Sequence, residues 1–139
     1  MDDPFDLQRF VDAQDRVYEQ VLAELRAGAK RSHWIWFIFP QLTGLGNSST
    51  ARRFGIGSLA EARAYLAHPV LGPRLHECTR LVTAIENASV DAIFGWPDNL
   101  KVRSSMTLFA RATDDNADFL TVLDTFYGGE EDPRTLDLL

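Results

Sequence analysis

The sequence predicts an all-α protein that folds as one domain over residues 1–139. Three observations support this fold class. In the long periodic segments the apolar residues recur at intervals of three and four, which is the spacing of one face of an α-helix. Ser, Asp, Gly and Pro stand where these segments begin and end, as helix caps and helix breakers do. The length suits one ordinary domain with its own core. We expect at least five helices and no sheet larger than a hairpin.

The composition is that of a globular protein, with 45% hydrophobic and 24% charged residues. The net charge of −6 and the pI near 4.9 disfavour a general attraction to nucleic acids or anionic membranes, because these are also negative. The single cysteine, Cys78, excludes an internal disulfide and a cysteine zinc site, and we expect no metal and no cofactor. The acidic N-terminus lacks the basic and apolar parts of a signal peptide, so we expect a cytoplasmic protein.

The first predicted helix runs from Leu7 to Gly28, with Asp6 as its N-cap. Its apolar residues form one stripe, and Gln14 lies in the middle of that stripe. We therefore expect Gln14 to be buried and hydrogen-bonded, because buried amides normally find partners. Its partner could be a backbone carbonyl or a ligand, and the pattern leaves both open.

Residues 30–41 read Lys-Arg-Ser-His-Trp-Ile-Trp-Phe-Ile-Phe-Pro-Gln, and no other stretch is as dense in hydrophobic residues. A bilayer-spanning helix needs about 20 apolar residues, so these rings must be buried in the core or in a ligand pocket. A short helix ended by Pro40 fits the segment. A strand with Trp34, Trp36 and Ile38 on one face fits it equally well.

Seven further helix starts are predicted from cap residues, at Ser48, Ser58, Pro69 or Pro73, Ser89, Asp98, Asp114 or Asp115, and Asp132. Cys78 belongs to the apolar stripe of the helix after the two prolines, which predicts an inert packing thiol. The helix after Asp98 carries Lys101, Ser104 and Ser105 beside its apolar face. Two serines at such a border are unusual for a face that is simply solvated. They could bond the carbonyls of their own helix or belong to a functional face, and the pattern leaves both open.

The three histidines differ in their surroundings. We expect His76 to be exposed on its helix and His68, which precedes a proline, to be a capping or surface residue. His33 stands between two cations and two tryptophans. Such surroundings would keep its imidazole neutral and able to act as an acid or base near pH 7. A core histidine without a catalytic role is the alternative.

Several motifs resemble those of a known family: Asp6-Leu7-Gln8-Arg9-Phe10, Ser32-His33-Trp34, Phe37-Ile38-Phe39-Pro40-Gln41, Gly44-Leu45-Gly46, His68-Pro69-Val70-Leu71-Gly72 and Ser104-Ser105-Met106-Thr107-Leu108-Phe109. The family consists of small bacterial proteins of unknown function, some of which carry the label "calpastatin". The resemblance covers nearly the whole chain. It implies a compact all-α domain, distantly similar to armadillo-type helix packing, in which the aromatic segment is helical.

We interpret the chain as a protein that binds a small anionic ligand, such as a nucleotide or an ADP-ribose-like compound, and that could also hydrolyse it. In this hypothesis Lys30, Arg31 and Lys101 meet the negative charge. His33 is the acid or base.

The other proposed site residues would stack on the ligand or orient it. They are Trp34 or Trp36 for stacking, and Gln14, Gln41, Ser104 and Ser105 for orientation. The hypothesis requires residues 30–36 and the Lys101–Ser105 face to meet in one concavity. The alternative is a non-enzymatic module that offers a helical groove or an aromatic patch to a protein partner.

Overall fold

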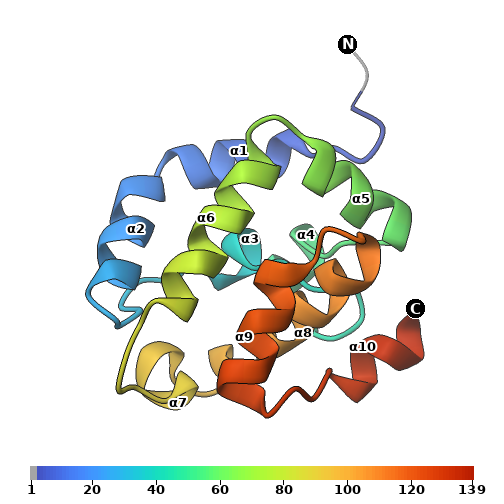
Figure 1. Cartoon of the computed structure of the whole chain (residues 1–139). Coiled ribbons are helices and arrows are strands. Elements are labelled where there is room, and N and C mark those ends of the chain that lie inside the picture. The colour runs from blue at the N-terminus through green and yellow to red at the C-terminus, as the bar shows by residue number, and fades with distance from the viewer. Residues whose placement is uncertain (1–2) are drawn as a thin grey trace.

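The computed structural model describes residues 3–139, and this part of the chain forms ten helices (Figure 1). They are α1 (Gln8–Asp15), α2 (Tyr18–Arg26), α3 (Ile35–Ile38), α4 (Ser49–Arg53), α5 (Leu59–Ala67), α6 (Leu71–Thr83), α7 (Val90–Phe94), α8 (Asp98–Ala112), α9 (Ala117–Tyr127) and α10 (Pro133–Leu138). Among the described residues the β-pairing consists of one isolated bridge, between Leu42 and Ile56. The predicted all-α fold class is confirmed. Residues 1 and 2 of the predicted domain lie outside the described residues.

The predicted first helix is in fact two helices, α1 and α2, which meet at an angle (Figure 1). The break lies at Val17, whose φ of −133° and ψ of 0° are not helical. A straight helix of twenty residues would be about 30 Å long, the width of a small domain, so one rod could not keep its whole stripe on the core. The predicted cap Asp6 was wrong as well. The carboxylate of Asp3 instead accepts the N–H groups of Leu7 and Gln8, at 2.7 and 2.9 Å.

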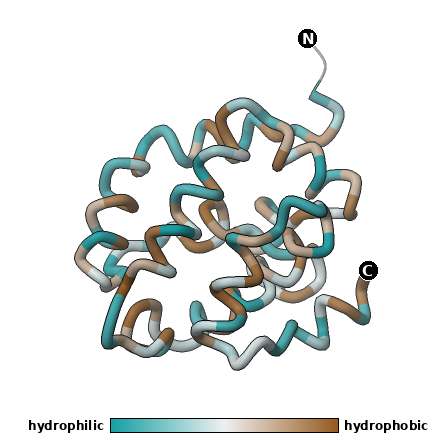
Figure 2. The backbone as a smooth tube through the Cα atoms, in the orientation of Figure 1, coloured by the Kyte–Doolittle hydropathy of each residue, from teal (hydrophilic) through white to brown (hydrophobic). Residues whose placement is uncertain are grey.

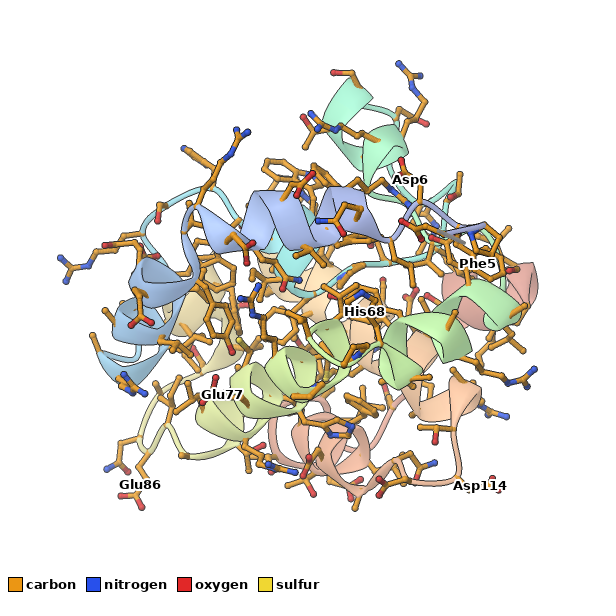
Figure 3. The ribbon with its side chains drawn as sticks, turned by 90° about the horizontal axis from the view of Figure 1, so that it is seen from above. Phe5, Asp6, His68, Glu77, Glu86 and Asp114 are labelled. Atoms are coloured by element: carbon orange, nitrogen blue, oxygen red, sulfur yellow. The ribbon has the colours of Figure 1, made fainter. Side chains whose placement is uncertain are left out.

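The aromatic segment forms α3, a single helical turn near the centre of the molecule that packs against α1 and α8 (Figure 1). The helical alternative for this segment is therefore confirmed, and the strand is not. After α3 the chain forms a loop that contains α4. The two ends of this loop meet where Leu42 pairs with Ile56. Seen from above, α4 projects away from the other helices (Figure 3).

One hydrophobic core joins the long helices, and the hydropathy along the backbone alternates as amphipathic helices require (Figure 2). α8 runs through this core, and every residue from position 104 to position 110 is buried. Aromatic rings fill the centre. The ring centroid of Tyr65 lies 5.2 Å from that of Phe10 and 5.2 Å from that of Phe109. Such pairs stabilise the core beyond the area they bury.

Four of the predicted caps are confirmed. The side chains of Ser48, Ser58, Ser89 and Asp132 each accept a backbone N–H from the first turn of the helix they begin. The start predicted at Pro69 or Pro73 lies at residue 71. There the imidazole Nδ1 of His68 accepts the N–H groups of residues 70 and 71, so its predicted capping role is also confirmed; Figure 3 shows His68 where α5 meets α6.

Two predicted caps were wrong. Asp98 is the first residue inside α8, where its carboxylate pairs with lysines rather than with the helix N-terminus. α9 begins after Asn116, not at Asp114 or Asp115. Asp suits the first turn of a helix as well as the cap position, because both lie at the positive end of the helix dipole.

The close approach of α6 to α5 depends on Gly72. A Cβ atom at this position would lie 2.1 Å from the backbone oxygen of Leu66, so no other residue fits without moving the backbone. This contact brings the start of α6 beside the end of α5.

No helix within residues 3–139 is both long enough and apolar enough to cross a membrane.

Candidate functional site

The segment before α3 is tied to α2 by the buried carboxylate of Glu24. This carboxylate accepts the backbone N–H groups of Arg31 and Ser32, at 2.6 and 3.0 Å, and the indole N–H of Trp34, at 2.9 Å. The Ser32 hydroxyl and the Gln20 amide donate to it as well. Burial alone raises the pKa of Glu24, but hydrogen bonds to its charged form outweigh burial and hold the pKa well below its usual range. Glu24 is therefore a charged structural anchor.

Two lysines share the carboxylate of Asp98. The Nζ atom of Lys30 lies 2.7 Å from Oδ2, and the Nζ atom of Lys101 lies 3.3 Å from Oδ1. The side chain of Lys30 is 7% exposed, whereas that of Lys101 is 23% exposed and reaches solvent. Two ammonium groups around one carboxylate leave one formal positive charge at this place, in a chain of net charge −6.

Each of these lysines also lies over an indole ring. The Nζ atom of Lys30 is 5.3 Å from the ring centroid of Trp34, and that of Lys101 is 4.9 Å from the ring centroid of Trp36, both within the range of cation–π attraction. Trp34 is fully buried, so of the two predicted stacking rings only the half-buried Trp36 can be reached by a ligand. We call Lys30, Trp34, Trp36, Asp98 and Lys101 the cation–aromatic cluster.

The cation–aromatic cluster confirms that residues 30–36 and Lys101 meet in space although they are far apart in sequence. Lys101 contacts Trp36 directly and reaches Lys30 through the carboxylate of Asp98. The predicted concavity stays a prediction. Five cavities of 290 to 590 Å³ lie elsewhere on the described chain, and neither lysine belongs to their walls.

His33 and Arg31 are neighbours of the cation–aromatic cluster in sequence, and both have exposed side chains. The expected apolar surroundings of His33 were wrong, because the chain bends at residues 32 and 33 to turn Trp34 inward and leaves the preceding imidazole in solvent. The alternative of a core histidine is wrong for the same reason. The role of His33 as an acid or base stays a prediction.

The two predicted glutamines come before and after α3 in the sequence, and their surroundings differ. Gln14 is buried, and its amide donates to the carbonyl of Phe37 at 2.7 Å and to the hydroxyl of Tyr65 at 3.0 Å. Its predicted burial and hydrogen bonding are confirmed, and these bonds hold α3 to α1 and α5. Gln41 is half-buried, and its backbone carbonyl accepts the N–H of Ile56 at 2.9 Å.

The two predicted serines of α8 have different surroundings. The Ser104 Oγ lies 3.1 Å from both the carbonyl oxygen of Leu100 and a carboxylate oxygen of Asp132, so its single O–H is shared between these acceptors, and the second contact helps to dock α10. The Ser105 hydroxyl is buried one turn after Lys101, and within residues 3–139 it has no hydrogen-bond partner. Such orphaned groups are rare in folded proteins.

Sequence reasoning missed both carboxylates that organise this region. Glu24 lies among Val21, Leu22 and Leu25, which are buried on α2, so the signal that identified Gln14 could also have found Glu24. Asp98 was assigned to a cap. Its partner Lys101 lies three residues later on the same helix face, but its partner Lys30 could be found only from the fold.

Two predictions outside the cation–aromatic cluster have clear outcomes. Cys78 is buried, and burial raises the pKa of its thiol to about 12, so the inert packing thiol is confirmed. His76 was wrongly expected to be exposed. Its ring packs on Phe119, with centroids 5.1 Å apart, and its Nδ1 lies 2.8 Å from the carboxylate of Asp118, because α9 packs against this face of α6.

The residues that the structure describes include no group of three or more His, Cys, Asp or Glu side chains that could hold a metal ion.

The ten-helix array with its cation–aromatic cluster defines a small all-helical domain. The chain belongs to the family described as "Protein of unknown function (DUF1810)", whose model matches residues 4–139. It is similar to the conserved hypothetical protein Rv1873 from Mycobacterium tuberculosis, with 64% sequence identity over 99% of this chain and 98% of that chain. The TM-score between this structure and that crystal structure is 0.98. No curated protein matches the chain.

Proposed function

We propose that the chain binds a small anionic ligand, such as a nucleotide or an ADP-ribose-like compound, at the cation–aromatic cluster, and that it works in the cytoplasm. The observation that carries this proposal is the surplus positive charge that arises because two lysines share Asp98. A phosphate or carboxylate is the natural partner of such a charge, since the hydrogen bond between them is charge-assisted.

The exposure of the side chains decides where the ligand would bind. Lys101 and Trp36 are partly exposed, so an anion that meets the ammonium of Lys101 would lie beside the indole ring. The exposed Arg31 and His33 are near in sequence and could meet a second charged group of the ligand. Hydrolysis would need His33 to act on the bound ligand as an acid or base.

A thermal-shift assay with AMP, ADP-ribose and inorganic phosphate tests the proposal. A ligand at 100 times its dissociation constant adds about 2.7 kcal/mol to the free energy of unfolding, which raises Tm by several degrees. We expect Lys101→Gln to weaken binding about tenfold and so to lower the stabilisation at the same ligand concentration to about half. Arg134→Gln, which removes the same charge from an exposed residue of α10, should leave the shift unchanged. The absence of any shift with the three anions would contradict the proposal.

An exposed apolar pair favours the alternative, a protein-interaction module. The side chain of Trp96 is 79% exposed, and that of Leu100, one turn along the chain, is 48% exposed. Exposed rings of this kind are enriched at binding surfaces. A photo-crosslinking residue placed at position 96 should then yield one defined adduct in cells, whereas the same residue at position 134 should not. Equal labelling at both positions would contradict this alternative.

A further inference from the structure

A groove lies where the end of α5 and the first turns of α6 face the junction of α8 and α9. It consists of two adjoining cavities of 440 and 290 Å³, whose walls share Leu66, His76 and Asp115. We call it the His76 groove. The close contact of Gly72 with α5 shapes one of its ends. None of the residues of the cation–aromatic cluster lines the His76 groove.

The imidazole of His76 is held in one orientation. Its Nδ1 lies 2.8 Å from Oδ2 of Asp118, and its ring packs on Phe119. A ring nitrogen this close to a carboxylate oxygen carries the proton, so the neutral imidazole has its lone pair on Nε2. No hydrogen bond within residues 3–139 uses Nε2, and the side chain is 22% exposed, so Nε2 can accept a hydrogen bond from a ligand.

The charges of the His76 groove are not all paired. Arg80 donates its Nε to Asp118 at 3.0 Å, so the charge of Asp118 is matched. Arg63 and Asp115 line the 290 Å³ cavity together, but no ion pair within residues 3–139 joins them. Arg63 is fixed by the hydrogen bond from its Nε to the carbonyl of Ala112 at 3.2 Å. One positive and one negative side chain, both exposed, thus line the same cavity without forming an ion pair with each other.

We propose that the His76 groove binds a small zwitterion of the α-amino-acid class. The guanidinium of Arg63 takes the carboxylate, because a guanidinium matches the planar geometry of that group. The ammonium group donates to the carboxylate of Asp115 and to Nε2 of His76. The side chain of the ligand packs on Leu66, and an apolar side chain suits this wall. Asp118 is a positioning residue that fixes the imidazole.

The test is an NMR titration that follows the Cε1–H signals of the three histidines in the full chain. L-leucine is the probe. Two fragments serve as matched comparisons: 4-methylpentanoate lacks only the ammonium group, and 3-methylbutylamine lacks only the carboxylate. L-leucine should shift the His76 signal saturably and leave that of the exposed His33 unmoved. Each fragment should bind at least about tenfold more weakly than L-leucine, because one charged contact is missing.

Two variants separate recognition from a general effect on the fold. Arg63→Gln and Asp115→Asn should each weaken the binding of L-leucine about tenfold while Tm stays within a few degrees. Arg134→Gln should bind as the unchanged chain does. The proposal is overturned if L-leucine gives no saturable shift of the His76 signal. It is also overturned if 4-methylpentanoate binds as tightly as L-leucine, since the ammonium group would then not be recognised.

Discussion

Glu24 and Asp98 are the two carboxylates that hold residues 30–36, and they do so by different physics. Glu24 is buried and accepts hydrogen bonds from neutral donors alone, namely two backbone N–H groups, a hydroxyl, an indole and an amide. Asp98 is partly exposed and pairs with two ammonium groups. Neutral donors satisfy a carboxylate without adding charge, whereas two ammonium groups exceed the charge of one carboxylate.

This difference distinguishes a structural contact, at Glu24, from the contact at Asp98 on which the proposed function rests. At Glu24 the bonding is complete and closed to solvent, so this contact stabilises the fold. At Asp98 the bonding leaves positive charge beside the partly exposed Lys101 and Trp36, and this is where the proposed ligand would bind. Variants of Glu24 should therefore change mainly the stability of the fold, whereas variants of Asp98 should also change the affinity for anions.

The largest effect is expected for Glu24→Gln. The new amide would turn an NH₂ group towards donors that need an acceptor, and these buried donors would lose their partners. We expect the free energy of unfolding to fall by about 3 kcal/mol, measured by urea denaturation. Glu19→Gln makes the same change at an exposed position of α2 and should have almost no effect. Equal stability of the two variants would contradict the anchoring role of Glu24.

The contribution of Glu24 should also depend on pH. Its pKa in the folded chain lies below the value of 4.5 that the group has without its partners, so the folded state stabilises the charged form. The stabilisation is fully present above about pH 4.5 and is lost as the pH falls towards the folded pKa. The difference in unfolding free energy between the unchanged chain and Glu24→Gln should therefore narrow between pH 5 and pH 3, as a rough window. A constant difference over this window would refute the account.

A smaller effect on stability is expected for Asp98→Asn. The nearly buried Lys30 would lose its carboxylate, which should cost about 2 kcal/mol. The same change removes the negative charge that competes with a ligand, so the affinity for anions should rise. Asp137→Asn, at an exposed position of α10 where no ion pair within residues 3–139 uses the carboxylate, is a control for the charge. A stability loss equal to that of the control would show that the shared carboxylate contributes nothing.

The smallest effects on stability are expected for Lys101→Gln and Trp36→Leu. Exposed ion pairs and exposed cation–π contacts are each worth about 0.5 to 1 kcal/mol, so Tm should change by a few degrees at most. Both variants should nevertheless weaken anion binding. If either variant unfolded at room temperature, the cation–aromatic cluster would be a structural element rather than a site.

Local signals in the sequence sufficed for the fold class and for most helix starts. Ser48, Ser58 and Ser89 act through their own first turn, so the residues around them determine the cap. The break at Val17 was not predictable in this way. The apolar stripe continues through Val17, so the periodicity gives no sign of the non-helical dihedral angles found there.

The sequence indicated which types of residue make up the candidate site, but not which side chains contact one another there. Lys101 and Trp36 were identified because cations and rings next to apolar residues are unusual, and the structure brings them together. The orientation of each side chain depends on the fold: Ser104 bonds Asp132 of the C-terminal segment, and His33 turns to solvent at a bend. No spacing within the sequence indicates either arrangement.

The central claim is that the surplus charge shared by Lys30 and Lys101 binds anions, and calorimetric titration with AMP and adenosine tests it most directly. The two probes differ only in the phosphate group. We expect AMP to bind most tightly to Asp98→Asn, less tightly to the unchanged chain and most weakly to Lys101→Gln, with steps of about tenfold. Adenosine should bind all three weakly and equally. If AMP and adenosine bound with the same affinity, or if Asp98→Asn did not strengthen the binding of AMP, the claim would be contradicted.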